Sequence, residues 1–265
     1  MFKYLAAVPL LFPTFALAQS TTMGDLIAKD VAGRWALGVG ASLSDSPYVG
    51  EDIRVRPFPW ITYEGERIFW RGLGGGVHAF KGDSVEVDFL VSGRFDGFDI
   101  DDLDARGLAG NGLNAGLLED RDDGADLGLS VSWEGSAGEI KLRALADVTD
   151  TSGGYEFAAD YSYPLHFGKT VVVPGIGVRW MSDDLVNYYY GTLDEEIARG
   201  VPLYQPGAAL VPQVSVGFMR ALGKKWSLFG SVDYKVLPDE IADSPLLERD
   251  VSGTLGLKVG INRRF

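Results

Sequence analysis

The sequence contains no cysteine and only two histidines. Without cysteine there is no disulfide framework, no thiol nucleophile and no Cys-ligated metal. After residue 18 no apolar run of about eighteen residues occurs, which excludes an ordinary membrane helix. The formal charge of −13 argues against a nucleic-acid partner, because phosphate binding depends on Lys and Arg. The chain is therefore either soluble or enters a membrane as strands.

The first eighteen residues have the pattern of a cleaved secretory signal. Lys3 precedes an apolar stretch over residues 5–15, and Ala16, Leu17 and Ala18 stand before Gln19. A charged start, an apolar centre and an A-x-A site are typical of Sec export. We expect residues 1–18 to be removed, residues 19–33 to form a periplasmic N-terminal segment, and residues 34–265 to form the folded domain.

Apolar and polar residues alternate with a period of two in several stretches. In residues 85–95 the apolar residues alternate with Glu86, Asp88 and Arg94, and residues 140–148 and 155–163 repeat the pattern. Helical spacing fits none of them, so they predict strands. Further candidate strands are 35–44, 52–63, 67–80, 125–134, 170–182, 208–221, 225–236 and 251–265.

The connections alternate between short and long. Short ones such as "EGSAG" and "LGKK" contrast with residues 96–124, 183–207 and 237–250. Short periplasmic turns and long extracellular loops are typical of an outer-membrane barrel, and a β-sandwich has no reason to show this asymmetry. Aromatic residues also lie mostly near strand ends, where interfacial girdles belong. The sequence predicts an all-β transmembrane antiparallel barrel.

The strand count is the weak point of this prediction. Eleven candidates are counted, whereas a bacterial barrel has an even number. The miscount is expected in residues 53–80, where Pro57, Pro59 and a glycine cluster blur the pattern. We expect about twelve strands, with ten as the alternative.

The polar face of the strands is expected to line the barrel interior. Its charged members form the predicted lumen-facing set: Glu86, Asp88, Arg94, Lys141, Arg143, Asp147, Asp160, Arg179, Asp233 and Lys235. These mixed charges suit either a narrow channel or a salt-bridged plug, since about eight strands are already filled by side chains.

Two loop motifs are weaker candidates for binding sites. Residues 96–126 hold ten acidic residues and two Arg, a net charge of −8. Within them Asp99, Asp101, Asp102 and Asp104 could supply oxygen ligands to Ca²⁺ or Mg²⁺, but the ordered spacing of an EF-hand is missing. A flexible acidic loop is the simpler interpretation.

The run Tyr188, Tyr189 and Tyr190 is expected to anchor the barrel at the membrane interface or to pack within a loop. A contact with a sugar or a partner protein is the alternative.

Several stretches together resemble the MipA/OmpV family of Gram-negative outer-membrane proteins. They are "SPYVGEDIRVRPFPWITYEGERIFWRGLGGG" (46–76), "VVPGIGVRWMSDDLVNYYYG" (172–191), "WSLFGSVDYKVLPDEIADSPLLERD" (226–250) and the closing strand. The resemblance implies an outer-membrane location, contact with lipid and lipopolysaccharide, and insertion by the barrel-assembly machinery. For the family's namesake it also implies a scaffold that bridges a lytic transglycosylase and a peptidoglycan synthase, while other members are described as adhesins or porin-like proteins.

The terminal assembly signal of such barrels departs from the usual pattern here. Leu257, Val259, Ile261 and Phe265 keep the outward alternation, but Arg263 replaces the usual aromatic residue. Arginine near an interface costs only about 0–1 kcal/mol, so recognition is expected to be weakened and not lost.

Catalysis is not supported by any motif. A serine hydrolase needs Ser, His and an orienting group together, and His78 with Ser84 or Ser92 has no motif around it. His166 is expected in a turn. No cofactor is expected, since the glycine run precedes a strand-like segment and not a helix. The leading hypothesis is a non-enzymatic scaffold, the alternatives are a narrow porin-like channel or an adhesin, and a lipid enzyme comes last.

Overall fold

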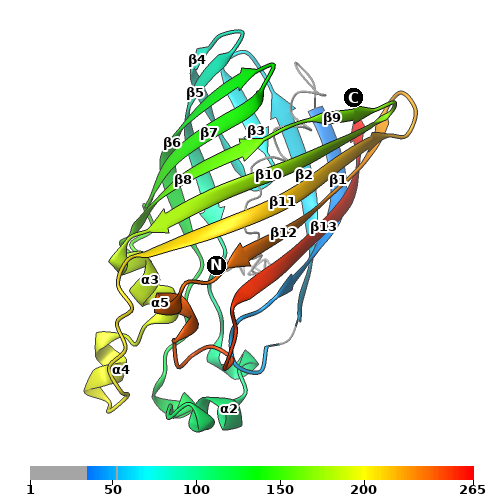
Figure 1. The fold of residues 1–265 in the computed structure, drawn as a ribbon. Coiled ribbons are helices and arrows are strands. Elements are labelled where there is room, and N and C mark those ends of the chain that lie inside the picture. Colours follow the sequence, from blue (N-terminus) through cyan, green and yellow to red (C-terminus); the bar gives the residue numbers. More distant parts are fainter. Residues whose placement is uncertain (1–34, 52) are drawn as a thin grey trace, which may run out of the picture.

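The chain forms a closed antiparallel β-barrel with helical connections at one end (Figure 1). The computed structural model describes residues 35–51 and 53–265, so the expected signal (1–18) and N-terminal segment (19–33) lie outside the described residues. The strands are β1 (Trp35–Asp45), β2 (Ile53–Glu64), β3 (Ile68–Arg71), β4 (Gly74–Lys81), β5 (Val85–Arg94), β6 (Gly124–Gly135), β7 (Gly138–Asp147), β8 (Tyr155–Ser162), β9 (Leu165–Phe167), β10 (Thr170–Met181), β11 (Ala209–Ala221), β12 (Trp226–Val236) and β13 (Gly253–Arg264).

The barrel closes because β13 pairs with β1 along nearly its whole length. Of the thirteen segments in the sheet, β8 and β9 pair with successive parts of β10 and make one interrupted strand of the wall. The wall therefore has twelve strands, which confirms the expected number. The interruption falls opposite Pro174, which has no N–H to donate to the ladder, and Tyr163 N–H donates to the Pro174 carbonyl there.

The predicted strand over residues 67–80 is wrong, because two short strands occupy it. β3 and β4 form a hairpin that turns at Gly72 and Leu73, and Gly72 has a φ of +68° that favours glycine. Both strands are rich in apolar residues and glycine, and only two residues separate them. A prediction from the alternation of residues therefore joins them into one strand. The error in the strand count therefore lies in residues 53–80, where it is expected.

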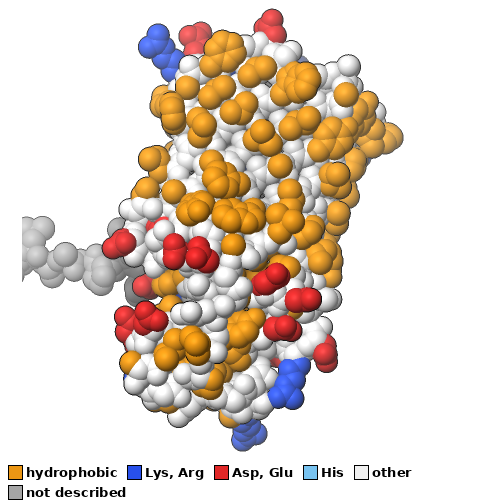
Figure 2. Space-filling model, turned by 60° about the vertical axis from the view of Figure 1, so that its left-hand side comes forward, with side chains coloured by type: hydrophobic (Ala, Val, Ile, Leu, Met, Phe, Trp, Pro, Cys, Tyr) orange, Lys and Arg blue, Asp and Glu red, His pale blue; other side chains and the backbone are white. Residues whose placement is uncertain are grey.

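The two faces of the wall differ as a barrel requires. Outward residues are apolar and exposed, for example Val39 at 65% and Phe89 at 55%, and hydrophobic side chains cover the wall in Figure 2. On β13, Leu257 and Val259 are exposed, and the Arg263 guanidinium lies 5.0 Å from the ring centre of Phe265. A soluble fold would bury such a surface, whereas hydrocarbon solvates it.

The connections after β1, β5, β10 and β12 fold together into a structured layer over one end, which we call the cap. It contains η1 (Ile100–Asp102), α2 (Ala105–Gly110), η2 (Ala115–Leu117), α3 (Asp183–Tyr190), α4 (Asp194–Ala198) and α5 (Asp239–Ala242). Its apolar core includes Leu108, Leu185, Tyr189, Ile241 and Leu247, all nearly inaccessible. Among the described residues, no helix is long and apolar enough to span a membrane.

The cap marks the loop end of the barrel, and the opposite end, with the connections after β2, β4, β6, β9 and β11, is the turn end (Figure 1). Outer-membrane barrels direct long loops outward and short turns to the periplasm. The cap therefore faces the exterior and the turn end faces the periplasm.

Candidate functional site

The interior at the loop end is crossed by a chain of ion pairs. Arg94 lies 2.8 Å from Asp126, 3.0 Å from Glu156 and 3.2 Å from Asp96, all between side-chain nitrogen and oxygen atoms. Arg179 lies 3.5 Å from the second oxygen of Glu156. These contacts connect β5, β6, β8 and β10 across this part of the lumen.

Three further members of the predicted lumen-facing set lie on the same interior face. Arg143 on β7 pairs with Asp160 on β8 at 3.3 Å, and Asp160 also accepts a hydrogen bond from Gln213 of β11 at 2.8 Å. Lys141 is buried on β7. Asp126 and Glu156, absent from the predicted set, stand at inward positions of strands that were recognised, so the alternation could have found them.

Asp147 stands directly opposite inward-facing Asp126 and also holds the adjoining loop. It is the last residue of β7, and its carboxylate accepts hydrogen bonds from the backbone N–H of Thr149 (2.8 Å), Ser152 (2.6 Å) and Gly153 (3.0 Å). These contacts fold the tight connection to β8. Asp147 thus organises a loop at the rim.

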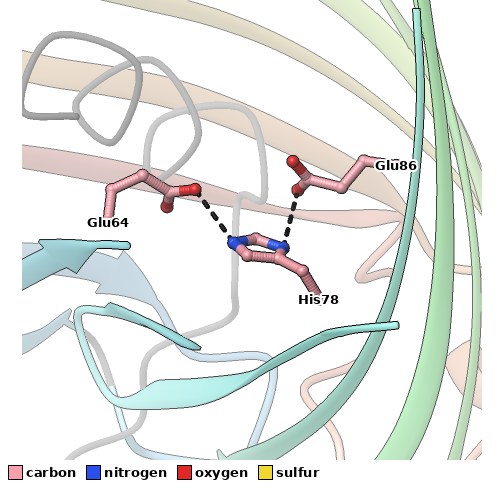
Figure 3. A group of neighbouring side chains, drawn as sticks. All are labelled: Glu64, His78 and Glu86. Atoms are coloured by element: carbon pink, nitrogen blue, oxygen red, sulfur yellow. Dashed lines mark hydrogen bonds and ion pairs between the residues drawn. The ribbon is translucent and has the colours of Figure 1, made fainter. Parts of the chain in front are cut away.

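A second polar cluster occupies the interior toward the turn end. His78 on β4 lies between Glu64 and Glu86 (Figure 3), with Nε2 at 3.1 Å from Glu64 and Nδ1 at 3.7 Å from Glu86. Its Nδ1 is also 2.7 Å from buried Asp88. Arg71 pairs with Glu64 at 3.0 Å and with Glu86 at 3.2 Å, while Lys81 contacts Glu64.

This cluster is the one metal-competent group of three among the described residues. The ligand atoms of Glu64, His78 and Glu86 lie within 4.8 Å of one another. Two cations, Arg71 and Lys81, already pair with the same carboxylates. A metal ion would have to compete with these ion pairs for its ligands.

A cavity of about 120 Å³ lies in the lumen beneath the cap. Arg54, Arg179, Lys235 and Lys258 line it together with Asp96 and Asp233, and Tyr189 and Tyr190 of the cap close it. Burial opposes the charge of Asp96, but Arg94, Lys235 and Arg179 outweigh that effect and hold the pKa of its carboxyl below the usual range. Lys235 and Asp233 of the predicted set therefore lie at this cavity.

The acidic stretch is folded and not a flexible loop. Asp104 caps α2 by accepting hydrogen bonds from the N–H of Arg106 (3.1 Å) and Gly107 (3.0 Å). Asp99, Asp101 and Asp102 are exposed on η1 and its cap. These four carboxylates are not among the metal-competent groups of the described residues.

The tyrosine run, Tyr188, Tyr189 and Tyr190, packs in the apolar core of the cap. The Tyr48 hydroxyl donates a hydrogen bond to the carbonyl of Tyr189 at 3.1 Å.

The histidines do not form a hydrolase site. Both ring nitrogens of His78 lie against carboxylates, which leaves neither one to accept a proton from Ser84 or Ser92. His166 is exposed on β9. The arrangement provides ion pairing and not an activated nucleophile.

The fold, with its lipid-facing wall and capped polar interior, defines an outer-membrane β-barrel protein. The family model described as MltA-interacting protein MipA matches residues 37–265. The MltA-interacting proteins of Escherichia coli K12 and Shigella flexneri are each 30% identical over 252 residues, covering 92% of this chain and 97% of the relative. Outer membrane protein OmpV of Vibrio cholerae is 25% identical over 236 residues, with 88% of both chains covered. The chain belongs to the MipA family, which confirms the resemblance and the outer-membrane location.

Proposed function

We propose that this chain is a non-enzymatic docking barrel that holds a murein-processing enzyme at its turn end. The observation that carries the proposal is the near-complete alignment with a relative whose name states that it interacts with MltA. On the resemblance, the candidate partners are a lytic transglycosylase and a peptidoglycan synthase. The turn end is the surface that meets such periplasmic enzymes.

The turn end has a basic sector that suits an acidic partner. It comprises Lys169, Arg220, Lys224, Lys225, Arg263 and Arg264. Hydrogen bonds between neighbouring turns hold the sector together: Ala221 N–H donates to the Lys169 carbonyl at 3.0 Å, and Arg264 N–H donates to the Lys225 carbonyl at 2.8 Å. Residues 163–170, 217–228 and 257–265 contain no Asp or Glu side chain, although the whole chain has a charge of −13. Such local complementarity steers association.

The test is capture of purified lytic transglycosylase MltA by the detergent-solubilised barrel. The K169E/K224E/K225E variant is expected to weaken binding at least about tenfold, since several charge contacts are reversed. R106E/R199E/R249E, which reverses three cap charges, serves as the matched control and should bind normally. Absence of binding by the unsubstituted protein, or equal binding by both variants, contradicts the proposal.

A narrow channel is the second candidate, and the cavity beneath the cap favours it. The cavity is lined by five cationic side chains, Arg54, Arg94, Arg179, Lys235 and Lys258, and by three carboxylates, Asp45, Asp96 and Asp233, so a channel through it would prefer anions. Planar-bilayer recording tests this: steady anion-selective steps support the channel, and silence over the voltage range supports the closed scaffold. The adhesin alternative would use the cap instead.

Contacts with the surrounding envelope complete the proposal. The exposed apolar wall contacts membrane lipid, and acidic side chains gather on the part of Figure 2 below that wall. Divalent cations could bridge such carboxylates to lipopolysaccharide phosphates. Insertion would use the barrel-assembly machinery, with the alternation Leu257, Val259, Ile261 and Phe265 as its signal. A stepwise calcium-dependent retention of lipopolysaccharide by the purified protein checks the bridging, and calcium-independent retention contradicts it.

A further inference from the structure

The barrel wall has an incomplete ladder on one side of β2. β2 pairs with β1 from Ile53 to Tyr63, but β3 reaches only its last residues, Thr62 to Glu64. The β3–β4 hairpin ends at Gly72, whose N–H donates to the Ile61 carbonyl at 2.9 Å. Beyond Ile61, no strand among the described residues pairs with the outer edge of β2. We call this edge, residues 53–60, the seam.

Pro57 and Pro59 of β2 lie on the seam in the register that removes two of its donors. Because Ile61 directs its carbonyl toward the hairpin, Pro57 and Pro59 direct their backbone groups the same way, two and four residues along. At both positions the N–H that would face the gap is missing. Proline at these positions also prevents another strand from pairing with the edge. The seam is thus built to stay open and not to add a strand.

The interior side of the seam is apolar and aromatic. Phe58 and Trp60 point inward with their ring centres 5.8 Å apart, and the Trp60 ring lies 5.0 Å from the ring centre of Phe229 on β12. A Cβ on Gly72 would lie 3.3 Å from the Trp60 ring, so this ring lies against the tip of the short hairpin. Outside the wall, Val55 and Ile61 are exposed and apolar. Apolar side chains therefore lie on both faces of the wall along the seam.

A cationic group, Arg56, stands next to the aromatic cluster on the same interior face. Arg56 precedes Phe58 by two residues, and its Nη1 is buried without a hydrogen-bond partner among the described residues. A buried guanidinium N–H without an acceptor is costly, and a carboxylate or phosphate oxygen would satisfy it. The Trp60 Nε1 is likewise buried without a partner. The cluster thus combines an apolar aromatic surface with a guanidinium group that can bind an anionic head group.

We propose that the seam is a lateral portal through which a fatty acid-like amphiphile enters from the surrounding bilayer, with its alkyl chain on Phe58, Trp60 and Phe229 and its acidic head on Arg56. An apolar chain gains from burial in roughly the proportion of its buried area. The acid gives the Nη1 group of Arg56 an acceptor, which no described residue supplies. A partner strand is excluded as occupant by Pro57 and Pro59.

Access from the bilayer is tested by quenching with phosphatidylcholine brominated on its acyl chains. In one protein Trp60 is the single tryptophan, with the other five changed to Phe. In the control all six are changed to Phe and F69W is added, which places an interior ring on β3, a strand paired on both edges. Native folding of each is first established by heat-modifiable migration. Stronger quenching of Trp60 is expected, and equal quenching in the two proteins overturns the portal.

Binding of the head group is tested separately with the fluorescent probe 11-dansylaminoundecanoic acid. Wild type is expected to bind it saturably, and R56Q to bind roughly tenfold more weakly because a charge-assisted contact is lost. R106Q, at an exposed position of the cap, should bind as wild type does. Non-saturable partition into wild type, or equal affinities for R56Q and R106Q, overturns the assignment of Arg56. Both tests are independent of MltA capture.

Discussion

Arg121 and Glu196 form a two-point ion pair whose side chains are both fully inaccessible to solvent. Nη1 lies 2.8 Å and Nη2 3.0 Å from the two carboxylate oxygens. The remaining guanidinium donors reach the carbonyls of Tyr188, Glu119 and Gly191. The carboxylate in turn accepts from the N–H of Glu119 and Leu193. The pair joins the connection after β5 to the connection after β10, and every polar atom in it has a partner.

Removing one member of that pair should open the cap without unfolding the barrel. Glu196→Gln leaves a buried guanidinium without its counter-charge, and such losses cost about 3–5 kcal/mol. We expect faster amide hydrogen exchange in residues 95–123 and 182–208, with the wall strands unchanged. Glu195→Gln is the control because Glu195 is exposed. Unchanged exchange in Glu196→Gln would mean that the apolar core alone holds the cap.

Asp96 should make the closure of the cap sensitive to acid. Its pKa is held below the usual range, despite burial, by Arg94, Lys235 and Arg179. A depressed folded pKa gives stability that is present above the unfolded value near 4 and is lost as the pH falls through the folded value. Thermal melting of wild type should therefore drop below about pH 4. Asp96→Asn should lower stability at pH 7 by about 1–3 kcal/mol and flatten this acid dependence; an unchanged profile contradicts the assignment.

The His78 cluster should behave as an ion-pair network and not as a zinc site. Arg71 and Lys81 already neutralise Glu64 and Glu86, so zinc is expected to leave the melting temperature unchanged. His78→Asn should lower the free energy of unfolding by about 1–3 kcal/mol because Asp88 and Glu64 lose a partner. His166→Asn, at an exposed position, should have no effect. A zinc-dependent rise that His78→Asn abolishes would establish a metal site instead.

Restoring the missing donors on the seam should destabilise the wall and allow edge pairing. Pro57→Ala with Pro59→Ala places two N–H groups at an edge that no described strand covers. Each unsatisfied donor costs about 1–3 kcal/mol, and two copies can satisfy both by pairing their edges. Chemical cross-linking in detergent should then reveal dimers that are missing from Pro202→Ala, a cap control. A stable monomeric double variant would show that the seam is covered by other means.

The sequence by itself determined the barrel, because alternation is a local property that fixes which side chains face lipid and which face inward. It located the region where the strands are hard to count, residues 53–80, and it indicated about twelve strands. It could not separate β3 from β4, since the break between them is only two residues long. Pro57 and Pro59 disturb the strand pattern of the sequence, but only the register with β1 and the hairpin reveals that they lie on an edge that no described strand pairs with.

Only the tertiary structure decided which inward charges meet and that the acidic stretch folds. Arg94 finds Glu156 across 62 residues of sequence, and Arg121 finds Glu196 across 75. Such partners depend on strand stagger and on packing between distant loops, and neither is encoded in a local period. The same cause explains why Glu196 is buried although Asp194 and Glu195 next to it are exposed.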